Sequence, residues 1–466
     1  MRSKLMTAVA VAASTILGAS VAAADPVQDQ LKLMEQRMAE MEDRLEATSE
    51  NLKTAEATVE KQQAVLSEAG LAEGADGARS AVGHFLQQVD VSGLVAASYN
   101  YRFIDDRDAN LFIGNSFRHQ NGDSFSLDQL WLTLDKPVNE ESRAGFHTDM
   151  LYGASAQAMR NSIVGRPLGG GATPGTSISD QNDFYLFSAY VSYLAPIGNG
   201  IRFDAGKHGT LMGIERVKTN VNFNITQGRV FGLIPIVNTG LLAETNLTDQ
   251  LSIAAAVFND VVSDTSFDDS RHKAYFSQIK YTGDKFTFKV DSIVGKNSGS
   301  GLQSDPFPNG SDDCKGGNAC QTAILDAVAT AQLTDDFEAW AQFVFVRHFG
   351  NSIVRQGDTH AFATAARYHV TEDTSFSTRL EYLRAEQNFN IAQVGAAAVP
   401  GMSEVVTATF TGAQALTDDL TLRAELRYDH SLTGNIGPFA SQSDTASGLG
   451  GRNDQLVGIA ELYYEF

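Results

Sequence analysis

The sequence is poor in cysteine and in positive charge, and after its first residues it has no long apolar run. Two cysteines in 466 residues exclude a dense disulfide framework and a cysteine-rich metal site. Lysine and arginine total 35 against 56 acidic residues, a formal net charge of −21. This balance argues against nucleic-acid binding, because phosphate contacts need clustered cations. The mean hydropathy of −0.17 is too polar for a bundle of membrane helices, and no later window reaches the ~18 consecutive apolar residues of a spanning helix.

Residues 1–24 are predicted to be a secretory signal peptide. Arg2 and Lys4 form a short basic start, an apolar stretch covers 5–21, and three alanines at 22–24 give the small-x-small pattern of a cleavage site. An uncleaved membrane anchor is the alternative. The sequence therefore predicts an exported protein.

Residues 25–69 carry a heptad pattern that predicts a periplasmic coiled-coil stalk. The apolar seam consists of Leu31, Met34, Met38, Met41, Leu45, Leu52, Val59 and Leu66. Glycine and proline are absent from 27–69, so at 1.5 Å per residue a helix of roughly 60 Å is expected. So narrow a seam needs partner chains to bury it; a lone amphipathic helix lying on a domain is the alternative. Residues 70–88, which hold four glycines, are interpreted as a linker.

From residue 89 to 466 the apolar residues recur with period two, in stretches of about ten residues. In the first stretch Val91, Val95 and Tyr99 share one face, opposite Ser92 and Ser98. Sixteen strands are predicted, beginning near residues 90, 124, 142, 183, 201, 236, 250, 273, 285, 322, 337, 361, 375, 403, 420 and 455. Seven short polar turns alternate with eight longer loops, as antiparallel strands require when both ends of the barrel chain lie on one side.

The charges on one face of most strands decide between a soluble sandwich and a membrane barrel. A sandwich would turn its apolar face inward, whereas a barrel with lipid outside and water inside explains apolar-out, polar-in strands without a membrane helix. The fold class is therefore predicted to be all-β, a sixteen-stranded antiparallel transmembrane β-barrel preceded by an α-helical coiled coil. Sixteen strands enclose a lumen wide enough for water. The pattern is noisy at 124–135, where Leu130, Leu132 and Leu134 share a face with Asp128.

The last strand ends with Leu462, Tyr464 and Phe466 on one face. It resembles the C-terminal recognition strand of bacterial outer-membrane proteins, which ends in phenylalanine and can be captured by strand addition. The resemblance implies a Gram-negative outer membrane, with its lipid and lipopolysaccharide, and the barrel-assembly machinery as partners.

The segment 206–215, Gly-Lys-His-Gly-Thr-Leu-Met-Gly-Ile-Glu, resembles the glycine–lysine and glycine–x–glutamate segment of the OmpL-like β-barrel porin-2 family. The later Arg229, Pro235, Thr239-Gly240 and Phe258-Asn259 fit the same resemblance. The heptad stalk resembles other porin groups whose N-terminal coiled coils reach into the periplasm. These resemblances imply a passive diffusion pore, a homotrimer and no cofactor. They imply no particular substrate.

The third long loop, 209–236, is the predicted constriction, because in sixteen-stranded porins this loop folds into the lumen. An ordinary external loop is the alternative. Its predicted site residues are Glu215, Arg216, Lys218, Asn222, Asn224 and Arg229. On the wall half-way round the barrel, the predicted site residues are Arg367, Arg379, Glu381, Arg423, Glu425 and Arg427. Basic residues around a narrow pore favour anions; a neutral hydrogen-bonded wall is the alternative, because acids accompany these arginines.

Other candidates have simpler interpretations. Cys314 and Cys320 flank five residues of a long loop, which predicts a local disulfide in an exported protein. His147 and Asp149 share an inward face and could serve a barrel enzyme as an acid–base pair, but a hydrogen bond in the lumen explains them, so no enzyme and no metal site are predicted. The rival functions are a channel specific for organic acids or sugars, although no aromatic run is seen on the inward faces, and a plugged barrel tethered to peptidoglycan through the stalk.

Overall fold

The computed structural model describes Lys53 and residues 88–103, 123–163, 184–261, 273–296, 321–349, 357–385, 403–432 and 454–466. The chain divides into two compact units, 1–88 and 89–466. The predicted signal peptide, the seam of the coiled coil, most of the linker, and Cys314 with Cys320 lie outside the described residues.

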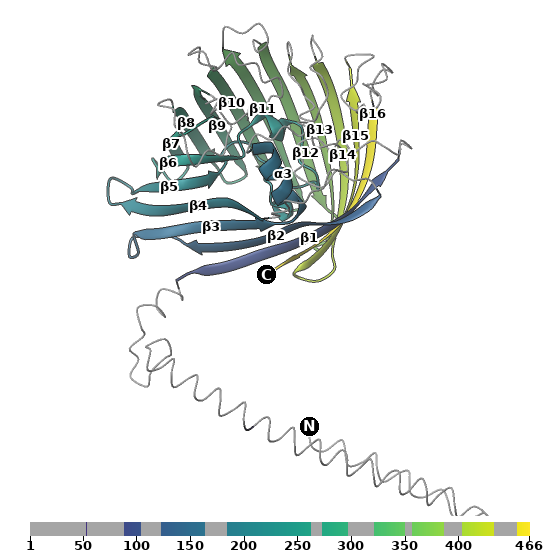
Figure 1. Cartoon of the computed structure of the whole chain (residues 1–466), viewed down its shortest axis with the longest axis horizontal. Helices are drawn as coiled ribbons and strands as arrows, with labels where there is room; N and C mark the ends of the chain where they lie inside the picture. Colours follow the sequence, from purple (N-terminus) through teal and green to yellow (C-terminus); the bar gives the residue numbers. More distant parts are fainter. Residues whose placement is uncertain are drawn as a thin grey trace, which may run out of the picture. The chain divides into compact units, whose positions relative to one another are not determined.

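The described part of 89–466 forms one closed antiparallel barrel of sixteen strands, which confirms the predicted fold of this unit (Figure 1). The strands are β1 (Asp90–Arg102), β2 (Ser124–Lys136), β3 (Ala144–Tyr152), β4 (Phe184–Ala195), β5 (Ile201–Gly209), β6 (Val237–Asn246), β7 (Leu251–Phe258), β8 (Ala274–Thr282), β9 (Phe286–Lys296), β10 (Gln321–Gln332), β11 (Phe337–Phe349), β12 (Gly357–His369), β13 (Thr374–Ala385), β14 (Ser403–Ala415), β15 (Leu420–Ser431) and β16 (Asp454–Glu465). Each strand pairs with its neighbours in sequence, and β1 pairs with β16 from Leu94–Glu465 to Arg102–Val457, which closes the sheet.

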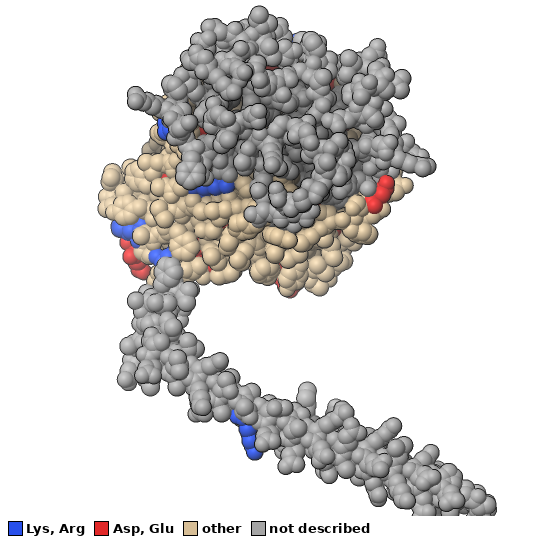
Figure 2. All heavy atoms as spheres, viewed as in Figure 1, with Lys and Arg blue, Asp and Glu red and all other residues tan. Residues whose placement is uncertain are grey.

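The outer surface of the wall is apolar. On β4 the outward Val191 and Tyr193 are 62% and 51% exposed, while Ser188 on the inner face is buried. Figure 2 shows the described wall on the near side as a broad surface of uncharged residues, with lysine, arginine and acidic side chains at its margins. Such a band of exposed apolar side chains is what contact with lipid requires. Among the described residues, no helix is both long and apolar enough to cross a bilayer.

A β-bulge explains the noisy pattern of β2. Ala96 of β1 lies opposite Gln129 but Ala97 lies opposite Leu127, so Asp128 is an extra residue in β2. Asp128 and Gln129 are both buried, whereas Leu127 and Leu130 are both exposed on the outer face. Placing Asp128 on the face of Leu130 was therefore wrong, because the bulge shifts the alternation by one residue.

The interior of the barrel is not uniformly polar, contrary to the prediction. The helix α3 (Ala154–Ile163) follows β3 and lies within the ring of strands (Figure 1), where it contacts β2, β3 and β4. Gln129, which faces inward from β2, donates to Ser155 Oγ at 3.2 Å. Ala156 and Met159 of the helix are buried. The period-two pattern predicts a long loop between the third and fourth strands and contains no signal for this helix.

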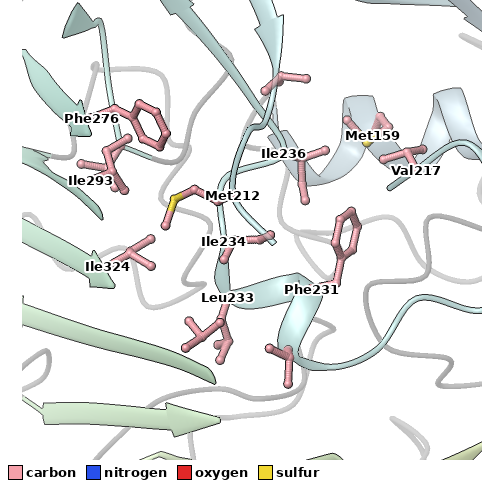
Figure 3. Packing of buried hydrophobic residues seen from close by; sticks show 14 of the residues in the cluster. Met159, Met212, Val217, Phe231, Leu233, Ile234, Ile236, Phe276, Ile293 and Ile324 are labelled. Carbon is pink, nitrogen blue, oxygen red and sulfur yellow. The ribbon is translucent and has the colours of Figure 1, made fainter. Parts of the chain in front are cut away.

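The second luminal element is the segment 210–236 between β5 and β6, called here the luminal loop. Most of its buried apolar residues belong to one cluster with the inner faces of β8, β9 and β10 (Figure 3). In that cluster Met212 and Ile234 come from the loop, while Phe276, Ile293 and Ile324 come from the strands. Fully burying one such side chain contributes ~1.5–3 kcal/mol, which stabilises a segment that crosses an otherwise aqueous lumen.

Candidate functional site

The luminal loop crosses the barrel from β5 and β6 to the wall formed by β13–β16. It contains two short 3-10 turns, η1 (Thr219–Val221) and η2 (Val230–Leu233). Thr219 Oγ1 donates to Glu461 Oε2 of β16 at 3.0 Å, and Ile225 N donates to Glu425 Oε2 of β15 at 2.5 Å. The loop is therefore fixed to strands that lie 200 to 242 residues away in sequence.

Arg379 on β13 lies between two carboxylates at one anchor of the loop. Its Nη1 donates to Glu215 Oε1 at 2.6 Å, and its Nε lies 3.3 Å from Glu381 Oε2. Glu215 Oε2 also accepts from the backbone N–H of Gly228 at 2.7 Å. A side chain at Gly228 would collide with Glu381, since a Cβ would lie 2.1 Å from its Oε1. Burial raises the pKa of Glu215, and the charge of Arg379 acts against this shift.

A second anchor lies at Asp429 on β15, which is held between two arginines. Its Oδ1 lies 3.0 Å from Nε of Arg229 in the loop, and its Oδ2 lies 3.0 Å from Nε of Arg427. Arg427 Nη1 also donates to the carbonyl of Gln227 at 2.9 Å. All three charged groups are buried, and burial lowers the pKa of Arg229.

Glu425 and Arg423, also on β15, bind the middle of the loop. Glu425 accepts from Ile225 N, from Thr226 N at 3.1 Å and from Thr226 Oγ1 at 2.6 Å. Arg423 pairs with Glu461 and donates to the carbonyls of Asn222 and Thr219, each at 3.2 Å.

Two of the predicted asparagines also hold the loop in place. The amide of Asn222 is hydrogen-bonded to both backbone groups of Arg216, at 2.8 and 2.7 Å, and closes the loop on itself. Asn224 Nδ2 donates to Thr411 Oγ1 of β14 at 2.8 Å.

The predicted arrangement of the opposite wall is wrong in one respect. Arg379, Arg423 and Arg427 were expected to face the loop across the lumen, but they bind it directly. The physical reason is the number of donors: an arginine side chain has five N–H groups. The neighbouring acid on the same strand accepts only some of them, so the others donate to backbone carbonyls of the luminal loop. Arg367 differs: it is half-buried, pairs with Glu338 at 2.5 Å and lies 4.3 Å over the ring of Phe223.

Two cavities flank the luminal loop. The first, of about 200 Å³, lies between the loop and the inner faces of β3–β6, with Arg216 in its lining. The second, of about 410 Å³, lies between the loop and β9–β11, with Phe223, Glu338 and Trp340 in its lining. Arg216 Nη1 donates to the carbonyls of Met212, Gly213 and Glu215 at 3.2, 3.3 and 2.8 Å. Lys218 of the loop is half-buried and lines neither cavity.

His147 is fully engaged in hydrogen bonds with the wall. Its Nδ1 is 2.8 Å from Asp135 and its Nε2 is 2.9 Å from Asp149, so both ring nitrogens have carboxylate partners. Its ring stacks on Tyr190 at 5.2 Å, which stacks on His208 at 4.8 Å. Among the described residues, no three His, Cys, Asp or Glu side chains come together in a way that could hold a metal ion.

The aromatic contacts of His147 continue around the inner wall. His208 contacts Phe258 at 6.0 Å, and Phe258 contacts Phe276 at 6.1 Å. The series takes one ring from each of β3, β4, β5, β7 and β8. The expectation that the inward faces carry no aromatic run was therefore wrong. Inspection of single strands could not find the run, because its members become neighbours only across the sheet.

Comparisons with known proteins agree with this architecture. A family model described as "Putative beta-barrel porin-2, OmpL-like" matches residues 88–466. The structure resembles OprB of Pseudomonas putida at 11% identity, covering 83% of this chain and 96% of that one, with a TM-score of 0.51. It also resembles OmpT of Vibrio cholerae at 10% identity, covering 81% and 97%, with a TM-score of 0.50. At these identities the likeness shows the fold alone. No curated protein matches the chain.

Proposed function

The chain belongs to the OmpL-like β-barrel porin-2 family of outer-membrane porins, and from this premise we propose that it forms a water-filled channel for passive diffusion of small hydrophilic solutes. The observation that carries the proposal is the luminal loop, fixed by buried ion pairs across a closed barrel with an apolar outer surface. A loop held in this way narrows a lumen, and both cavities beside it have polar side chains in their linings. The cavities on its two sides support this function.

The proposal extends to parts of the chain outside the described residues. Residues 1–24 act as the signal peptide, 25–69 form a periplasmic stalk that joins three chains, and 70–88 link it to the barrel. Cys314 and Cys320 form a disulfide in a long loop. The stalk could also contact peptidoglycan.

We further propose that the channel prefers anions. Arg229, Arg379, Arg423 and Arg427 contribute little to this preference, since each is buried against an acid. Arg216 and Lys218 are half-buried; among the described residues, the structure shows no carboxylate ion pair for either. A narrow low-dielectric constriction focuses the field of such charges, whereas charges beyond about 8 Å are screened at physiological salt.

Neutralising both cations is expected to shift the selectivity of the channel toward cations. A charge about 4 Å from a passing ion contributes about 1 kcal/mol even in water, so the anion-to-cation permeability ratio of Arg216→Gln/Lys218→Gln should fall by about fivefold or more. Reversal potentials across a KCl gradient measure this ratio.

Arg347→Gln, which removes an exposed cation paired with Asp358, is the control and should leave the ratio unchanged. A parent channel that prefers cations and does not respond to the double substitution would contradict the anion preference. A parent barrel without conductance would favour the plugged tether.

Disrupting the heptad seam is expected to weaken the oligomer without changing the barrel. Each buried leucine contributes ~1.5–3 kcal/mol, so Leu45→Asp/Leu52→Asp should remove roughly 3–6 kcal/mol per chain from assembly. The temperature at which oligomers dissociate in detergent gels should fall, while the β-sheet signal in circular dichroism stays unchanged. Oligomers that melt like the parent would show that the stalk does not stabilise the assembly.

A further inference from the structure

The first cavity has one apolar wall and one charged wall. The luminal loop supplies the apolar wall through Leu211, Val217, Phe231 and Ile236. The inner faces of β3–β5 supply the opposite wall, which includes Asp149, Asp204 and Arg202. A solute that occupies this cavity therefore meets apolar and polar surfaces at the same time.

The charged groups on the strand wall already have partners. Asp149 accepts from Thr133 Oγ1 at 2.5 Å, from His147 Nε2 and from Ser188 Oγ at 3.1 Å. Arg202 bridges two carboxylates through Asp204 at 3.1 Å and Glu244 at 2.8 Å. Asp149, Asp204 and Glu244 outnumber the one arginine, Arg202, and His147 adds a positive charge only when it is protonated. This wall is therefore net negative and repels a carboxylate, which leaves the loop side of the cavity as the place where an anion could be held.

Arg216 is the exception in the lining of this cavity. Its guanidinium donates through Nη1 to three backbone carbonyls of its own loop. Burial lowers its pKa, since desolvation disfavours the charged form. The nearby charges of Asp291 and Asp326 also stabilise this guanidinium. Its hydrogen bonds are to neutral carbonyls, so an anionic oxygen would add a stronger bond, because charge-assisted hydrogen bonds are about twice as strong as neutral ones.

We propose that this cavity binds small solutes that carry one carboxylate on a single ring, with the carboxylate on Arg216 and the ring against the apolar wall of the loop. The proposal rests on the proposed function and names a solute class for the channel. The size agrees: the cavity has about 200 Å³, and an apolar cavity of about 150 Å³ holds benzene.

Benzoate is the probe that tests the proposal, in planar bilayers and by calorimetric titration of the detergent-solubilised full-length protein. Benzoate should reduce the KCl current with saturation and give a measurable binding heat. Acetate, which lacks the ring, and benzyl alcohol, which lacks the charge, should each do so only at about tenfold higher concentration or more.

Two variants separate the carboxylate contact from the ring contact. Arg216→Gln should raise the half-saturating concentration of benzoate about tenfold, and Arg216→Lys should recover part of the loss. Leu211→Trp should weaken benzoate binding because the larger side chain fills the space beside the apolar wall. Arg347→Gln is the control with parental binding.

The outcomes distinguish this proposal from the proposed function. A parent that conducts KCl but binds benzoate no better than acetate overturns the proposal and leaves the channel function intact. Binding that neither Arg216→Gln nor Leu211→Trp weakens also overturns it. A parent that binds benzoate in solution through Arg216 but never conducts would overturn the channel function and leave the binding site intact.

Discussion

Replacing Arg379 with methionine is expected to free the luminal loop and to give a channel with a larger single-channel conductance than the parent. Arg379 is fully buried and contacts Glu215 and Glu381. Breaking a buried ion pair by removing one partner costs about 3–5 kcal/mol, because the other charge stays buried without compensation. In Arg379→Met, Glu215 and Glu381 would both stay buried without a positive partner. Both carboxylates also accept backbone N–H groups of the luminal loop, so their displacement would release the loop.

Conductance and the entry of larger sugars into liposomes measure this prediction. Arg379→Met should conduct more than the parent and admit sugars that the parent excludes. Arg347→Met is the matched control, since an exposed pair contributes only about 0–1 kcal/mol. Adding Glu215→Gln and Glu381→Gln to Arg379→Met should recover much of the parental behaviour, because both amides still accept from the loop and neither carboxylate is left without its arginine. A single mutant with parental conductance, size limit and stability would show that this ion-pair group does not hold the loop.

Deleting Phe466 is expected to reduce strongly the amount of barrel inserted in the membrane. Phe466 makes the last contact between β1 and β16, where the barrel closes. The backbone N–H of Gly93 donates to the carbonyl of Phe466 at 2.8 Å, and the N–H of Phe466 donates to the carbonyl of Gly93 at 3.1 Å. Its ring covers Gly93, where a Cβ would lie 2.2 Å from the ring. Two backbone hydrogen bonds of about 1 kcal/mol each are lost, so closure of the seam should weaken by roughly tenfold or more.

Two comparisons separate recognition by the assembly machinery from closure of the seam. Phe466→Tyr keeps the backbone and an aromatic ring, and should insert like the parent. Gly93→Ala keeps Phe466, but its Cβ would lie 2.2 Å from the ring and 2.7 Å from the carbonyl oxygen of Trp131 on β2. It should therefore reproduce at least part of the defect both in cells and in refolding from urea into detergent. If the deletion lowers yield in cells but not in refolding, the ring acts as a recognition signal. Equal yields from the deletion and the parent in both assays would remove any role for Phe466.

The barrel could be predicted from the sequence, because its signals are local. Alternation such as that of β7, where Ile253 and Val257 face lipid while Ser252 and Ala254 are buried, follows from the period-two geometry of a strand beside a bilayer. Short polar turns, such as the one between Asn246 and Leu251, mark where each hairpin ends. Neither the alternation within a strand nor the composition of a turn depends on the conformation of distant segments.

Which charged residues of the site pair with one another is decided by the tertiary structure. The sequence located Glu215 and Arg379 as charged site residues, but they are 164 positions apart, and only closure of the barrel brings them within 2.6 Å of each other. The same holds for the bulge at Asp128, which exists only relative to β1. Charge and periodicity along a chain show which residues face the lumen. Which of those charges are neutralised, and which remain available to a solute, depends on pairings between distant segments.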